Sequence, residues 1–162
     1  MAPSPGRIAI FLPLAVSIGV TFCTVIVHAL VLIAVVHFVR RGLRLGYAGV
    51  RFWKDVTVVA GTTLLALVAH LIEIAGWAVV FVLCGEFPHF AAAFYHSAVN
   101  YSSLGYGDVI MSGSWKLMGP LETADGMLMF GVSAAMIFAI VQRLIQTRVQ
   151  RLTQTRLHDS GG

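Results

Sequence analysis

Three long apolar runs divide the chain, and each is long enough to cross a bilayer as a helix. Residues 8–39 carry no charged side chain, and residues 56–84 carry only Glu73. A third run, residues 126–141, reaches the necessary length if the helix continues to Ile145. A spanning helix needs about 20 predominantly apolar residues. The pattern therefore predicts three transmembrane helices.

A shorter apolar and aromatic stretch, residues 89–101, lies between the second and third runs and follows Pro88. It is too short to cross a bilayer. Backbone that enters a membrane without crossing it must have its polar groups satisfied by protein or by water in a cavity. We therefore expect a re-entrant helix, and the predicted fold class is an all-α membrane protein with three transmembrane helices and this re-entrant helix.

Composition agrees with a membrane protein. Hydrophobic residues make up 58% of the 162 positions and charged residues 11%, with a mean hydropathy of +0.86. Soluble domains carry about 25% charged residues. The sequence contains no phosphate loop, nucleophile elbow or paired catalytic carboxylates, so we do not expect an enzyme. Cys23 and Cys84 lie within apolar runs and indicate neither a disulfide nor a zinc site.

The basic residues are concentrated in two places, which predicts the orientation of the chain. Four of them lie in the last twenty residues, and five lie in the connector at 40–55, namely Arg40, Arg41, Arg44, Arg51 and Lys54. Cytoplasmic segments are enriched in Lys and Arg. We therefore expect a cell-membrane protein with its N-terminus outside, its C-terminus in the cytoplasm and its connector near anionic lipid. The sequence has no nucleic-acid-reading motif, so nucleic acid is not an expected partner.

The segment after the re-entrant helix carries the chemistry, and it reads Ser102-Ser103-Leu104-Gly105-Tyr106-Gly107-Asp108. It resembles the filter of the potassium-channel pore family, which reads Thr-Val-Gly-Tyr-Gly and is commonly followed by Asp. Stacked backbone carbonyls can replace the hydration oxygens of a cation. Gly105 and Gly107 can adopt positive φ, which allows successive carbonyls to face one axis. The resemblance covers roughly residues 56–145.

The resemblance implies passive, potassium-selective conduction with no cofactor other than the permeant ion. One filter strand cannot surround an ion, so a homotetrameric pore is implied. Potassium would bind at Ser103, Leu104, Gly105 and Tyr106, and the path would run from Ser103 to Gly107. By the same resemblance, Ser103 supplies a hydroxyl at the inner end, Leu104 and Tyr106 pack behind the filter, and Asp108 fastens its outer mouth.

The resemblance also divides the chain into three parts. Residues 56–145 would form the pore domain, with an outer helix, a pore helix, the filter and an inner helix. Residues 1–55 would add a peripheral transmembrane helix, packed on the outer helix, and the basic connector. Residues 146–162 would form a cytoplasmic tail. The sequence contains no recognisable ligand-binding domain, so the stimulus that opens the pore is not predicted.

Several residues are expected to support the filter. Family members often brace the filter with two tryptophans of the pore helix, and this chain has Tyr95 and His96 at those positions. Glu73 lies near the expected depth of the inner end of the filter. We expect it to contact the re-entrant helix, with His96 or Asn100 as the first partner to test and His70, three residues away, as the alternative.

Gly131, in the third apolar run, is a candidate gating hinge, because family inner helices often bend at a glycine. The alternative is that it only allows close packing of helices through small residues.

Three other functions remain open at this point. A weakly selective monovalent cation channel is one, since Ser102 and Ser103 replace threonine and Leu104 replaces valine. A haem-binding membrane protein is another, because His28 and His70 could lie at a similar depth and act as axial ligands. The third is an accessory subunit that does not conduct by itself.

Overall fold

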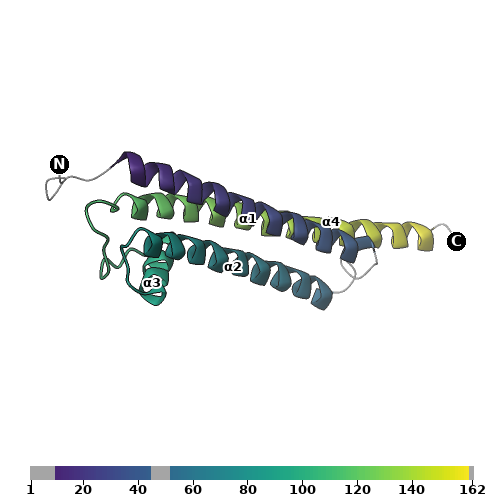
Figure 1. Cartoon of the computed structure of the whole chain (residues 1–162). Coiled ribbons are helices and arrows are strands. Elements are labelled where there is room, and N and C mark those ends of the chain that lie inside the picture. Colours follow the sequence, from purple (N-terminus) through teal and green to yellow (C-terminus); the bar gives the residue numbers. More distant parts are fainter. Residues whose placement is uncertain (1–9, 45–51, 161–162) are drawn as a thin grey trace, which may run out of the picture. The chain divides into compact units, whose positions relative to one another are not determined.

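The computed structural model describes residues 10–44 and 52–160, and these residues form four α-helices (Figure 1). The helices are α1 (Phe11–Arg44), α2 (Phe52–Leu83), α3 (Phe90–Tyr101) and α4 (Met118–Ser160). Three of them, α1, α2 and α4, are long and apolar enough to cross a membrane. The predicted all-α arrangement of three candidate spans and one short helix is confirmed.

The short helix α3 has the bounds expected from the sequence. His89 precedes it with extended backbone, at φ −132° and ψ 137°, and Ser102 follows it. Its 12 residues correspond to a length of about 18 Å, which is well short of the hydrocarbon core of a bilayer. Figure 1 shows α3 packed beside the C-terminal end of α2.

The long helices extend into segments that were expected to be connectors. Helix α1 continues to Arg44, because arginine and leucine have high helix propensity and continue an existing helix readily. Helix α2 begins at Phe52. Helix α4 begins at Met118, so the expected start near Gly126 is wrong. The physical reason is that Pro120 falls in the first turn, where proline has no hydrogen bond to lose. Arg51 of the connector lies outside the described residues.

Contacts divide the chain into two compact units. The first comprises Met1–Ala29, as far as it is described, and Val68–Gly131, and the second comprises Leu30–Leu67 and the described part of Val132–Gly162. The boundary falls inside all three long helices. This division follows packing along the helices, whereas the functional division at residues 55 and 145 stays a prediction.

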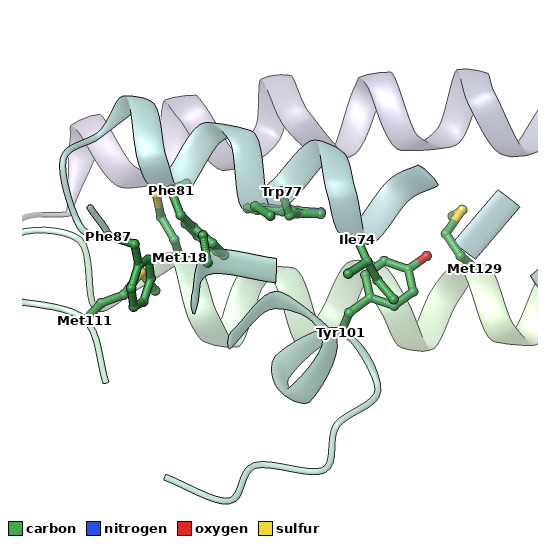
Figure 2. Packing of buried hydrophobic residues seen from close by; sticks show 10 residues of the cluster. Ile74, Trp77, Phe81, Phe87, Tyr101, Met111, Met118 and Met129 are labelled. Atoms are coloured by element: carbon green, nitrogen blue, oxygen red, sulfur yellow. The ribbon is translucent and has the colours of Figure 1, made fainter. Parts of the chain in front are cut away.

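The first unit is built around large aromatic and sulfur-containing side chains from α2, α3 and α4. Trp77, Phe81, Tyr101 and Met118 are completely buried. Figure 2 shows Phe81 and Met118 gathered with their neighbours at one end of the cluster, with Trp77 beside them and Tyr101 further along. This core holds α3 and the residues that follow it.

The second unit has an aliphatic core. Val35 and Val39 of α1 form one cluster with Ala66 of α2 and with Met136, Ile140 and Leu144 of α4. The spacing of four residues places each set on one face of its helix. Within this unit, helix α1 therefore contacts α2, as expected, and it also packs with α4. An ion pair between Asp55 and Arg148 adds a polar link.

Candidate functional site

Residues 102–108 form a short loop that begins directly at the end of α3. Positive φ occurs at every second residue, with 57° at Ser103, 62° at Gly105 and 72° at Gly107. Glycine adopts this conformation freely, as expected for both glycines, whereas an L-residue such as Ser103 incurs a cost of about 1–2 kcal/mol. Alternation of positive and negative φ allows successive carbonyl groups to face the same side, unlike in a β-strand.

The first half of this loop is fixed to the last turn of α3. The backbone N–H of Ser103 donates to the carbonyl of Asn100 at 2.8 Å. The N–H groups of Leu104 and Gly105 both donate to the carbonyl of Val99, at 2.9 and 3.3 Å. These carbonyls have no partner within the helix, and they carry the partial negative charge of its C-terminal end. The loop therefore starts beside the negative end of the helix dipole.

The side chains of the loop are exposed in the single chain. Leu104 is 54% exposed and Tyr106 is 66% exposed. The expectation that they pack behind the filter is not met within this chain, because none of its described segments covers them. The loop therefore presents both its backbone and two large side chains outward.

The far end of the loop is held by side chains of α3. Tyr95 Oη donates to Asp108 Oδ2 at 2.8 Å. His96 Nδ1 donates to the carbonyl of Val109 at 2.9 Å, and Asn100 Nδ2 donates to His96 Nε2 at 2.8 Å. Tyr95 is thus bonded to the last residue of the loop, and His96 with Asn100 connects α3 to the residue that follows it.

The charge states in this bracket follow from the hydrogen bonds. A carbonyl can only accept, so His96 Nδ1 carries a proton and its Nε2 accepts from Asn100. Burial lowers the pKa of His96, and the bond to Val109 and the nearby Asp108 offset this only in part. The hydrogen bond to Asp108 raises the pKa of the Tyr95 hydroxyl. His96 and Tyr95 are therefore both neutral at pH 7.

The last turn of α3 lies directly against α4. A Cβ atom added at Gly126 would lie 2.1 Å from the carbonyl oxygen of Tyr101, so only glycine fits there. One turn earlier, Thr123 Oγ1 donates to the carbonyl of Asn100 at 2.9 Å. Helix α4 therefore supports the end of α3 through backbone contacts, which the sequence alone did not indicate.

Ser97 fixes the middle of α3 to both neighbouring helices. Its hydroxyl lies 2.8 Å from the carbonyl of Ile74 on α2 and is also hydrogen-bonded to Glu122 on α4. Ser97 and Glu122 are completely buried. Glu122 precedes the third apolar run at residues 126–141, and the early start of α4 is what brings it inside.

Glu73 lies at the centre of a buried cluster formed by three helices. It accepts hydrogen bonds from Tyr101 of α3, from His70 Nδ1 at 3.2 Å and from His28 Nδ1 of α1 at 2.9 Å. The expected contact with the re-entrant helix is present, but its partner is Tyr101, and the expectation of His96 or Asn100 is wrong. The reason is that Glu73 faces the end of α3, whereas His96 is bonded to Val109.

The two histidines of this cluster bear on the metal and haem alternatives. His28, His70 and Glu73 place possible ligand atoms within 4.8 Å of one another, so these residue types could hold a metal ion. The imidazole rings are 5.2 Å apart, and both Nδ1 atoms contact the same carboxylate. Neither Nδ1 is directed at a haem iron between the rings. The geometry favours a hydrogen-bonded connection between α1 and α3 over a haem site.

A second buried carboxylate also binds α1 to the rest of the first unit. Asp125 of α4 accepts from Thr24 Oγ1 at 2.8 Å and from Trp77 Nε1 at 2.9 Å. The sequence missed this trio. A signal was present, since an indole N–H in an apolar span needs an acceptor when it is buried.

Gly131, the hinge candidate, lies in an uninterrupted stretch of α4. No atom lies within 4 Å of the Cβ position at Gly131, so within the chain the close-packing alternative applies to Gly126 and not to Gly131. The boundary between the two compact units in α4 falls immediately after Gly131.

Residues 67–143 match the family model described as an ion channel. Over that segment the chain is similar to this ion channel family. The match contains the second half of α2, all of α3, the loop at 102–108 and α4 as far as Arg143. The matched stretch is slightly shorter than residues 56–145 and supports the predicted ion channel. The three long apolar helices agree with a multi-pass membrane protein. No curated protein and no solved structure matches the chain.

Proposed function

We propose that this chain is an ion channel that conducts potassium selectively through a homotetrameric filter made of residues 103–107. The observation that carries the proposal is the alternation of positive φ at Ser103, Gly105 and Gly107 in a loop that is exposed on the single chain. Such a backbone can present a row of carbonyl oxygens, which is what a partly dehydrated cation requires.

Assembly into four copies follows from two features of the loop. One strand supplies oxygens on only one side of an ion, so further strands must complete the ring. Leu104 and Tyr106 are exposed apolar side chains beside that strand, and a neighbouring copy would cover them. The C-terminal end of α3 would then direct partial negative charge towards the ion path.

The orientation is part of the proposal. The loop at 102–108 belongs to the same unit as the N-terminal half of α1, whereas Arg40, Arg41 and Arg44 lie at the other end of that helix. The positive-inside rule places the arginines in the cytoplasm. The filter mouth and the N-terminus would then lie outside, and the C-terminus would lie in the cytoplasm.

Potassium flux into liposomes that contain the purified full chain tests the proposal. We expect flux of potassium that exceeds that of sodium by at least an order of magnitude, and loss of flux in Gly105→Ala, because alanine at φ +62° is strained. Equal sodium and potassium flux through the wild-type chain would instead support the weakly selective channel. The weakly selective channel remains a candidate because the chain has Ser103 and Leu104 where the potassium-channel filter has threonine and valine.

The same preparation decides between a channel and an accessory subunit. The purified chain alone should conduct, and it should show no Soret absorbance. A chain that conducts only after a second protein is added would be an accessory subunit, and a Soret band that His70→Ala abolishes would favour the haem protein.

A further inference from the structure

A groove of about 660 Å³ lies in the second unit, between the C-terminal part of α1 and the middle of α4. Its wall is mainly aliphatic, with Leu32 and Val36 contributed by α1 and Met136 by α4. Further along the same two helices, Arg40, Arg44 and Arg143 line it. Because the numbering rises in the same direction on both walls, the groove is apolar at one end and cationic at the other. Its volume is in the range of small-molecule sites.

The three arginines have no partner in the part of the chain that the structure describes. All are exposed, and none of their guanidinium groups takes part in a hydrogen bond or ion pair there. By contrast, Arg148, which lies further towards the C-terminus of α4, is paired with Asp55. Three unneutralised guanidinium groups around one opening demand an anion, and guanidinium geometry matches phosphate oxygens well.

The position of the groove identifies the kind of anion. Both walls belong to helices that are apolar and long enough to cross a membrane, so the groove opens towards lipid. Acyl chains have the polarity of its aliphatic end, and a phosphodiester has the charge that its arginine end requires. A phospholipid with net negative charge satisfies both ends at once, whereas free phosphate satisfies only one.

We propose that this groove binds one anionic phospholipid from the leaflet that borders Arg40 and Arg44. The lipid phosphate lies among the three arginines, and an acyl chain lies along Leu32 and Met136. The expectation of an anionic-lipid contact at the basic connector is thereby narrowed, because Arg41 does not line the groove and Arg143 of α4 does. Helix α1, which lies outside the family match, gains a role as one wall of the site.

Native mass spectrometry of the purified full chain with added phosphatidylglycerol or phosphatidylcholine tests this site. Wild type should retain phosphatidylglycerol in preference to phosphatidylcholine. The double variant Arg40→Gln/Arg143→Gln should bind it about thirtyfold more weakly, from about fivefold for each basic residue near an anionic lipid surface. The single variants Arg40→Gln and Arg41→Gln form the matched pair, because each removes one charge from the same turn and only Arg40 lines the groove.

A second variant keeps the charges and changes the cavity. Ala139 lines the apolar wall, and Ala139→Phe should fill it and weaken phosphatidylglycerol binding while all arginines remain. An unchanged thermal unfolding midpoint in lipid-free detergent confirms that the variant is folded. Inorganic phosphate should not compete at millimolar concentration, and full competition would overturn the lipid assignment.

Equal retention of the two lipids would also overturn the lipid assignment, and so would equal loss of lipid in Arg41→Gln and in the double variant. A second copy of the chain in the groove would overturn it as well. That outcome would be seen as dissociation of the oligomer in the double variant without loss of lipid. The readout is lipid retention, so it is independent of potassium selectivity.

Discussion

The contact between Gly126 and the carbonyl of Tyr101 allows a sharp test of how α4 supports α3. In Gly126→Ala, the new Cβ would lie 2.1 Å from the carbonyl oxygen, 2.9 Å from the carbonyl carbon and 3.1 Å from Cδ1 of the ring. Non-bonded heavy atoms are ordinarily about 3.5 Å or more apart. The two helices would therefore have to separate by more than about 1 Å at this point.

The cost can be worked out from the neighbouring contacts. Overpacking of this kind costs about 1–3 kcal/mol. Separation would also stretch the bond from Thr123 to the carbonyl of Asn100 and the bond from Tyr101 to Glu73, at about 1 kcal/mol each. The higher helix propensity of alanine returns about 1 kcal/mol. We expect Gly126→Ala to lower the free energy of unfolding by about 2–4 kcal/mol per chain.

Thermal or denaturant unfolding of the purified full chain in one detergent measures this loss. Gly131→Ala is the matched control, because the same substitution five positions later on the same helix meets no atom within 4 Å. It should leave stability unchanged or raise it by up to about 1 kcal/mol. If Gly126→Ala unfolds like the wild type, or if Gly131→Ala is destabilised as strongly, the packing of α3 on α4 described above is wrong.

Three further predictions concern the supports of the loop. Tyr95→Phe removes the hydroxyl that bonds Asp108, so potassium flux should decay faster after its onset than in wild type; an unchanged time course would remove Tyr95 from filter support. Tyr101→Phe leaves buried Glu73 with one hydrogen-bond donor fewer, so it should lower the free energy of unfolding by about 1–3 kcal/mol, measured with denaturant. A loss below about 0.5 kcal/mol would contradict the hydrogen bond between Tyr101 and Glu73. Burial lowers the pKa of His96 in the folded chain, so below its ordinary value of about 6.5 the unfolded chain binds the proton first. Stability should therefore be constant above that pH and fall as the pH drops below it, and His96→Gln, which retains a donor and an acceptor, should reduce the slope; an equal slope in the variant would assign it elsewhere.

The sequence predicted the features that depend on local pattern. The three spans and α3 follow from runs of apolar residues, and positive φ at Gly105 and Gly107 follows from the absence of a Cβ. The start of α4 was missed because Glu122 and Asp125 look like loop residues when considered alone. Each becomes compatible with a buried helix only through partners on other helices.

Pairings between helices could not be predicted for a related reason. The partner of Glu73 depends on the rotation of α2 relative to α3, and a change of one residue in that rotation exchanges one set of neighbours for another. The sequence fixes which side chains share a face of one helix, as His70 and Glu73 do, but it does not fix which face of another helix they meet. Tyr101 and His28 became identifiable only from the packed structure.

The central claim is that the backbone of residues 103–107 forms a potassium-selective filter. The most direct measurement is the reversal potential of the purified full chain in a planar bilayer, with potassium on one side and sodium at the same concentration on the other. The account predicts a reversal potential displaced by more than about 60 mV in the direction of potassium permeation, which corresponds to at least tenfold selectivity. A reversal potential at zero would contradict it.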